Sequence, residues 1–65
     1  MTCRELLQML QSQVDRESQF IENEIQMTPV HDQGKKCVSH FMAPVENKTK
    51  LFKVVIEEVC VYEGL

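Results

Sequence analysis

Residues 51–62 read LFKVVIEEVCVY, and no other stretch of this length in the chain is as apolar. Four valines, one isoleucine, one leucine and two aromatic residues fall among these twelve positions. Such a density of β-branched and aromatic side chains is typical of a buried strand. We therefore expect this stretch to lie at the centre of the fold, with at least one of its faces covered.

Two adjacent glutamates, Glu57 and Glu58, interrupt the alternation of this strand. Strict alternation would turn Glu58 inward and would send Val59 and Val61 outward. A β-bulge at the two glutamates would restore the phase and return both valines to the core face, and we expect that bulge. A helix over residues 50–63 is the weaker alternative, because β-branched side chains disfavour it.

Two turn signals upstream predict that the strand belongs to a three-stranded meander. Residues 32–34 read DQG, which is typical of a hairpin loop, and Asn47 with Lys48 can form a two-residue turn. In the register that pairs His31 with Lys35, Ile25 lies opposite Phe41, and the second turn places Val54 opposite Phe41. Both registers put the same apolar side chains on one face, namely Ile25, Met27, Phe41, Phe52, Val54 and Ile56.

The chain begins with a capped amphipathic helix. Thr2 and Glu5 have the spacing of a capping box, in which each side chain accepts a hydrogen bond from the other residue's backbone amide. Apolar residues follow at helical spacing and are expected to cover the sheet face. They are Leu6, Leu7, Leu10 and Val14.

The end of this helix is open to two interpretations. Residues 11–27 contain neither Gly nor Pro, so a single helix that continues through residues 19–27 is one of them. We prefer a break near Ser18 and Gln19, because the first hairpin needs a strand at residues 25–31 as its partner.

The totals agree with one small globular domain. The chain has 65 residues, and its 43% hydrophobic and 26% charged residues are ordinary for a folded protein. We predict a single α+β domain over residues 1–65, in which one N-terminal helix packs on a three-stranded antiparallel β-meander (αβββ). A chain this short buries only about 60% of its unfolded surface, so a partner, a metal or a disulfide would add stability.

The three cysteines, Cys3, Cys37 and Cys60, are odd in number and widely spaced, which favours reduced thiols over a disulfide scaffold. The N-terminal residues lack the pattern of a signal peptide. No apolar run approaches the roughly 20 residues that span a bilayer. We expect a soluble, cytoplasmic protein with no membrane contact.

Neither metal nor catalytic chemistry is well supported by the spacing of the reactive residues. Cys37 and His40 form one CxxH pair, but zinc sites normally need two such pairs, and on a strand these two positions face apart. Ser39 and His40 also face apart as strand neighbours, which argues against nucleophilic catalysis. We therefore predict a non-enzymatic protein without catalytic residues, metal site or cofactor.

Basic residues form two clusters, Lys35/Lys36 and Lys48/Lys50/Lys53, near opposite ends of the second predicted strand. A nucleic-acid-binding accessory protein that uses these clusters is the alternative function. The formal net charge of -3 argues against it, because nucleic-acid binders usually carry a basic face.

Protein contact is the function that the sequence favours. The predicted sheet has two open edges and a second face with several valines, and self-association would add buried surface. The candidate interaction surface consists of Val30, Val38, His40, Lys53 and Val55. We expect a homodimer that acts as a regulatory or inhibitory module, for example one that a phage or mobile element encodes to block a host protein.

Overall fold

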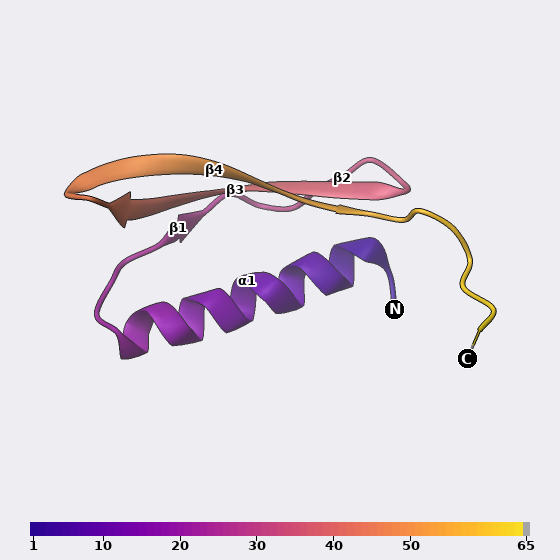
Figure 1. Ribbon diagram of the computed structural model, residues 1–65, viewed down its shortest axis with the longest axis horizontal. Coiled ribbons are helices and arrows are strands. Elements are labelled where there is room, and N and C mark those ends of the chain that lie inside the picture. Colours follow the sequence, from indigo (N-terminus) through magenta and orange to yellow (C-terminus); the bar gives the residue numbers. More distant parts are fainter. Residues whose placement is uncertain (65) are drawn as a thin grey trace.

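One helix packs against one face of an antiparallel sheet in the computed structural model, which describes residues 1–64 (Figure 1). The elements are α1 (Cys3–Phe20), β1 (Gln26–Met27), β2 (His31–Asp32), β3 (Lys36–Val45) and β4 (Lys48–Glu57). The central strand β3 carries β1 and β2 along one side and β4 along the other. Because β1 and β2 are two pieces of one interrupted strand, the predicted α+β meander is confirmed.

The start of α1 is the predicted capping box. The Thr2 hydroxyl accepts a hydrogen bond from the Glu5 amide at 3.1 Å, and the Glu5 carboxylate accepts one from the Thr2 amide at 3.0 Å. The bond from the Thr2 backbone lowers the pKa of Glu5. The helix ends at Phe20, close to the predicted break, and the strand at residues 26–27 excludes a single helix through this region.

The helix is rotated relative to the predicted orientation. Leu7 is fully buried as expected, but Leu6 and Leu10 remain 46% and 38% exposed, so they do not cover the sheet as the pattern predicted. The least exposed side chains of α1 are Cys3, Leu7, Gln11, Val14 and Ser18. Polar residues therefore share the sheet-facing side of the helix with the apolar ones.

The turn between β3 and β4 uses residues 46 and 47, both with positive φ, of 53° and 65°. Such angles belong to the primed turns that suit a two-residue hairpin. The predicted turn lay one residue later, so the register is shifted and Phe41 lies opposite Phe52 instead of Val54. A shift of two residues leaves every side chain on its predicted face.

The first hairpin differs more from the prediction. His31 lies opposite Val38, not Lys35, and Gly34 adopts the expected positive φ, of 91°. In β1, Met27 lies opposite Phe41, which keeps Met27 on the predicted face. The two pieces differ in register by one residue, so the strand is interrupted between them.

The interruption is at residues 28–30, where side-chain bonds replace the regular ladder. The Thr28 amide donates to the His40 carbonyl at 2.9 Å, and the Thr28 hydroxyl accepts from the His40 amide at 2.9 Å. Pro29 follows directly and has no amide to donate, which an edge strand tolerates. The edge position predicted for this proline is confirmed.

The predicted continuation of β4 beyond the two glutamates is wrong. The strand ends at Glu57, and Val59 and Val61 are both exposed instead of returning to the core through a bulge. The reason lies in the partner strand, which begins at Lys36 opposite Glu57, so later residues have no strand to pair with. The stretch that starts at Leu51 is also not central, because β4 lies at an edge of the sheet.

The helix orientation can be tested with two neighbouring leucines. We expect Leu7→Ala to lower the free energy of unfolding by about 2–5 kcal/mol, because its side chain is fully buried. Leu6→Ala is the matched control, and we expect it to cost clearly less, since Leu6 is half-exposed. Urea denaturation followed by circular dichroism measures both values. Equal losses would contradict the orientation described above.

Candidate interaction surface

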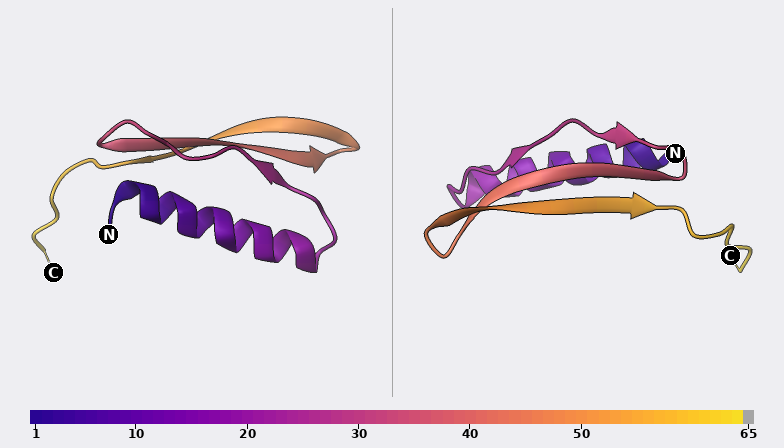
Figure 2. Two further views of the ribbon diagram at one scale, coloured as in Figure 1. Left: turned by 180° about the vertical axis from the view of Figure 1, so that it is seen from behind. Right: turned by 90° about the horizontal axis from the view of Figure 1, so that it is seen from above.

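Strand β4 is only partly covered by the helix, which contacts it at Ile56. Seen from above, α1 lies beneath β1, β2 and β3, and β4 projects past it (Figure 2). Leu51, Phe52 and Val55 are 66%, 45% and 42% exposed. Leu51 and Val55 lie on one face of the strand and Phe52 on the other. Apolar side chains on both faces of β4 are therefore open to solvent.

The outer edge of β4 also carries free backbone groups. Val45 and Lys48 flank the two-residue turn and form a hydrogen-bonded pair, and such pairs recur at every second position of an antiparallel ladder. The bond from the Glu58 amide to the Lys35 carbonyl, at 2.7 Å, fits this alternation. Within residues 1–64, the outward amides and carbonyls of β4 therefore face no neighbouring strand. They belong to Thr49, Leu51, Lys53, Val55 and Glu57.

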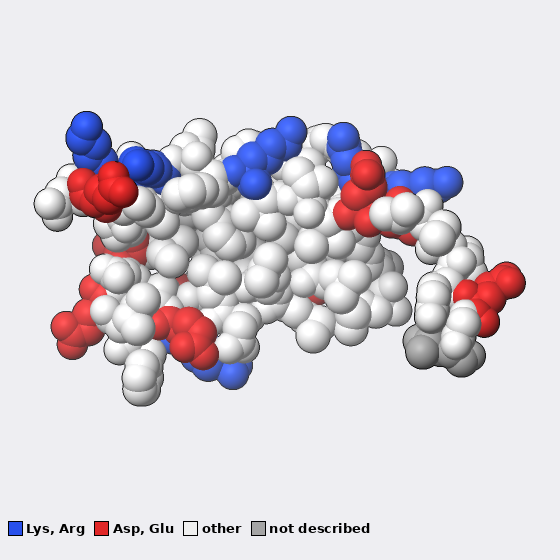
Figure 3. All heavy atoms as spheres, in the orientation of Figure 1, with Lys and Arg blue, Asp and Glu red and all other residues white. Residues whose placement is uncertain are grey.

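Charge changes sign along β4. Lys48, Lys50 and Lys53 lie in its first six residues, whereas Glu57 is its last residue and Glu58 follows directly. Lys50 is only weakly paired, since its ammonium lies 3.8 Å from the exposed Glu46 carboxylate. On the face shown in Figure 3, the basic side chains are spread along the sheet in separate groups.

The structure brings together part of the predicted interaction surface. Val38, His40 and Lys53 line one depression of about 320 Å³ on the sheet. Val55 lies opposite Val38 in the neighbouring strand, whereas Val30 does not line the depression. Val38 is only 7% exposed, so it contributes little contact area. The prediction did not include Leu51 and Phe52, although their apolar character was the available signal.

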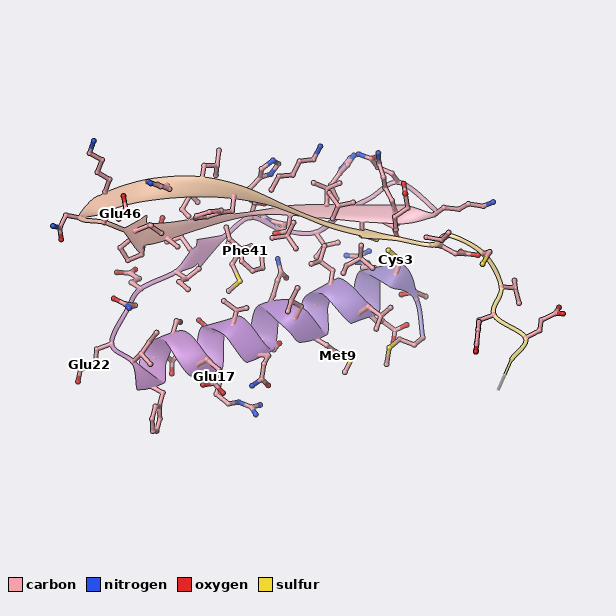
Figure 4. All side chains as sticks on the ribbon, viewed as in Figure 1. Cys3, Met9, Glu17, Glu22, Phe41 and Glu46 are labelled. Carbon is pink, nitrogen blue, oxygen red and sulfur yellow. The ribbon has the colours of Figure 1, made fainter. Side chains whose placement is uncertain are left out.

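A polar cluster joins the helix to the sheet. The Gln11 side-chain amide donates to the Thr28 carbonyl at 2.8 Å and to the Ser39 hydroxyl at 2.9 Å. Ser39 is fully buried and also donates to the Thr28 carbonyl at 2.8 Å. Phe41 points into the same layer from β3, whereas Met9 and Glu17 point away from the sheet (Figure 4). Because its polar atoms bond one another, this cluster has a structural role.

The cysteines gather at the end of the molecule where α1 begins. The Cys3 thiol donates to the Ile56 carbonyl at 3.0 Å, and Cys37 lies opposite Ile56 in the sheet. Burial raises the pKa of the Cys37 thiol to about 11, and the neighbouring Cys3 and Asp32 act in the same direction. Cys60 is exposed and borders a depression that Cys3 also lines. Cys37 is therefore protonated and shielded at neutral pH.

Metal ligands do not gather in the described part of the chain. No three side chains of the types His, Cys, Asp and Glu come together there as a potential site. Cys37 and His40, the CxxH pair noted in the sequence, are three residues apart on β3. Because side chains alternate along a strand, the two point to opposite faces of the sheet.

Comparison of the chain with protein-family models, curated proteins and solved structures finds no match. Among residues 1–64, no helix combines the length and the apolar character that a bilayer crossing requires.

The burial of the thiols predicts an order of alkylation. In the native protein we expect iodoacetamide to modify the exposed Cys60 first and the buried Cys37 last, because a thiol reacts as its accessible thiolate. A time course followed by peptide mass spectrometry measures the order. In concentrated urea the three cysteines should react at similar rates, which is the control. Modification of native Cys37 as fast as Cys60 would contradict the packing of β3.

Proposed function

We propose that this protein acts without catalysis by binding other protein chains, and that it associates with itself. The observation that carries the proposal is β4, an edge strand of ten residues whose apolar side chains are exposed on both faces. An exposed edge of this kind is a ready site for a further strand. A contact there would pair free backbone groups and cover apolar surface at the same time.

The small core supports the same proposal. Among residues 1–64 the buried apolar side chains are only Leu7, Cys37, Val38 and Phe41. A short chain with so few buried side chains gains stability from any partner that covers more apolar surface. Among the possible roles we favour a regulatory or inhibitory module, since an added strand can occlude the edge of a larger protein's sheet.

The lysines of β4 are the basis of the alternative, nucleic-acid binding. The basic groups on the face shown in Figure 3 are separated, and the net charge of the chain is -3. A phosphate-binding surface would instead concentrate basic residues along one path. We therefore favour protein contact over nucleic-acid contact.

One capture experiment separates the two functions. The chain is immobilised, and nuclease-treated and untreated extracts of its native host are passed over it. We expect a protein to be retained equally from both extracts, and binding to change little when salt rises from about 50 to about 200 mM, a range over which phosphate contacts weaken steeply.

Two variants provide the matched comparison. Leu51→Ser should reduce the capture, because it removes exposed apolar area from β4, whereas the double variant Lys35→Ala, Lys48→Ala should leave it nearly unchanged, because these exposed lysines lie outside the apolar part of β4. Capture that requires intact nucleic acid and these two lysines would overturn the proposal in favour of the alternative.

A further inference from the structure

We propose that two copies of this chain pair through the free edges of β4, antiparallel and about a two-fold axis, to form one continuous sheet with both helices on the same face. This inference rests on the self-association in the proposed function, and it specifies the surface and the register. A second copy of the chain is the partner whose charges and side chains fit those of β4.

Symmetry restricts the register. In a two-fold antiparallel pair one residue of each strand lies opposite its own copy, because the axis passes through a residue pair. The outward backbone groups belong to Leu51, Lys53, Val55 and their odd-numbered neighbours, so the hydrogen-bonded pairs join odd-numbered residues. Moving from one allowed register to the next therefore shifts one strand by two residues along the other.

One of these registers creates favourable side-chain pairs on the helix-facing side of β4. When Val54 lies opposite its own copy, Phe52 lies opposite Ile56 of the second copy, and Lys50 lies opposite Glu58. The half-exposed Phe52 then packs on an aliphatic side chain, and the weakly paired Lys50 gains a carboxylate. Each of these contacts occurs twice, once on each side of the axis.

Each of the two neighbouring registers contains an unfavourable pair. One shift places Lys50 opposite Ile56 of the second copy and brings the two copies of Lys53 directly together. The other shift places Phe52 opposite Glu58. Like charges directly opposite one another destabilise a strand pair, and an apolar side chain opposite a carboxylate gains little. On the helix-facing side, the register centred on Val54 avoids both arrangements. On the outer face it places Leu51 opposite Glu57 of the second copy.

The outer face is compatible with this register. Lys53 lies opposite Val55 of the second copy, so the aliphatic part of the lysine can cover the exposed valine. Lys53 and Glu57 of the second copy are both diagonal neighbours of Lys53, and the opposite charge of Glu57 offsets the like charge of the second lysine. A central lysine often protects an edge strand from pairing, but here the partner supplies a carboxylate for it.

A proline substitution tests the pairing. Val55→Pro removes an outward amide that does not take part in the bonds to β3, so the monomer can keep its fold while the dimer loses two hydrogen bonds. We expect the dimer dissociation constant, measured by sedimentation equilibrium, to rise at least about tenfold. Thr49→Pro is the matched control. Its amide also points outward, but it lies outside the paired segment, so its dimer should match wild type.

A charge exchange tests the register. Lys50→Glu should weaken the dimer, because it places two carboxylates opposite each other, and the double variant Lys50→Glu, Glu58→Lys should restore the wild-type dissociation constant. Lys48→Glu makes the same charge change on the same strand outside the paired segment, and should have a much smaller effect. Failure of the double variant to recover any affinity would overturn this register.

The outcomes distinguish the inference from the proposed function. A dimer that Val55→Pro leaves intact would overturn the edge pairing but leave self-association through another surface. A chain that stays monomeric over the whole concentration series would overturn both the pairing and the self-association. Circular dichroism of each variant checks that the monomer has folded, and a variant that unfolds is replaced by Lys53→Pro, which removes the neighbouring outward amide.

Discussion

The position of the helix over the sheet is the constraint from which the other features follow. The Gln11 amide bonds at once to Thr28, in the interrupted edge strand, and to Ser39, in the central strand. Because one side chain joins both strands, α1 is held over the seam between them. The helix therefore lies mainly over the β1–β3–β2 side of the sheet (Figure 2). It reaches β4 at Ile56, whose carbonyl accepts a hydrogen bond from the Cys3 thiol, and it leaves Phe52 half-exposed.

This arrangement places polar side chains where an apolar layer was expected. Ser39 and Ser18 are buried, and among the described residues no buried side-chain nitrogen or oxygen lacks a hydrogen-bond partner. A satisfied network is tolerated in a core, although it contributes less than apolar packing of the same volume. Leu6 and Leu10 are turned partly outward, so apolar area that could have strengthened the core stays open to solvent.

The sequence predicted the faces of the sheet better than the pairing of its strands. Period-two alternation identifies which residues share a face, so Phe41 and Phe52 were correctly placed together although the turn lay one residue earlier. The pattern carries no information on which residue of a strand opposes which. The pairing also changes by one residue between β1 and β2, after Thr28, whose hydroxyl accepts a hydrogen bond from the His40 amide, and no alternation reveals this change.

The position of the half-buried Gln11 could not be predicted for a related reason. A glutamine among leucines is normally assigned to the exposed side of a helix, and its burial depends on a carbonyl and a hydroxyl that distant segments supply. The same limit affected the end of β4. Valines after Glu58 resemble a strand, but a strand needs a partner, and the partner is defined by where β3 begins.

The two edges of the sheet are built differently, and this contrast bears on function. The β1–β2 edge is interrupted at residues 28–30 and contains Pro29, features that block pairing with another strand. Strand β4 is uninterrupted over ten residues and contains no proline. A chain that acts as a monomer would benefit from protection of both sheet edges against pairing with other chains. Only the β1–β2 edge has a break in the strand and a proline, whereas β4 carries lysines alone, and this contrast favours the proposed pairing along β4.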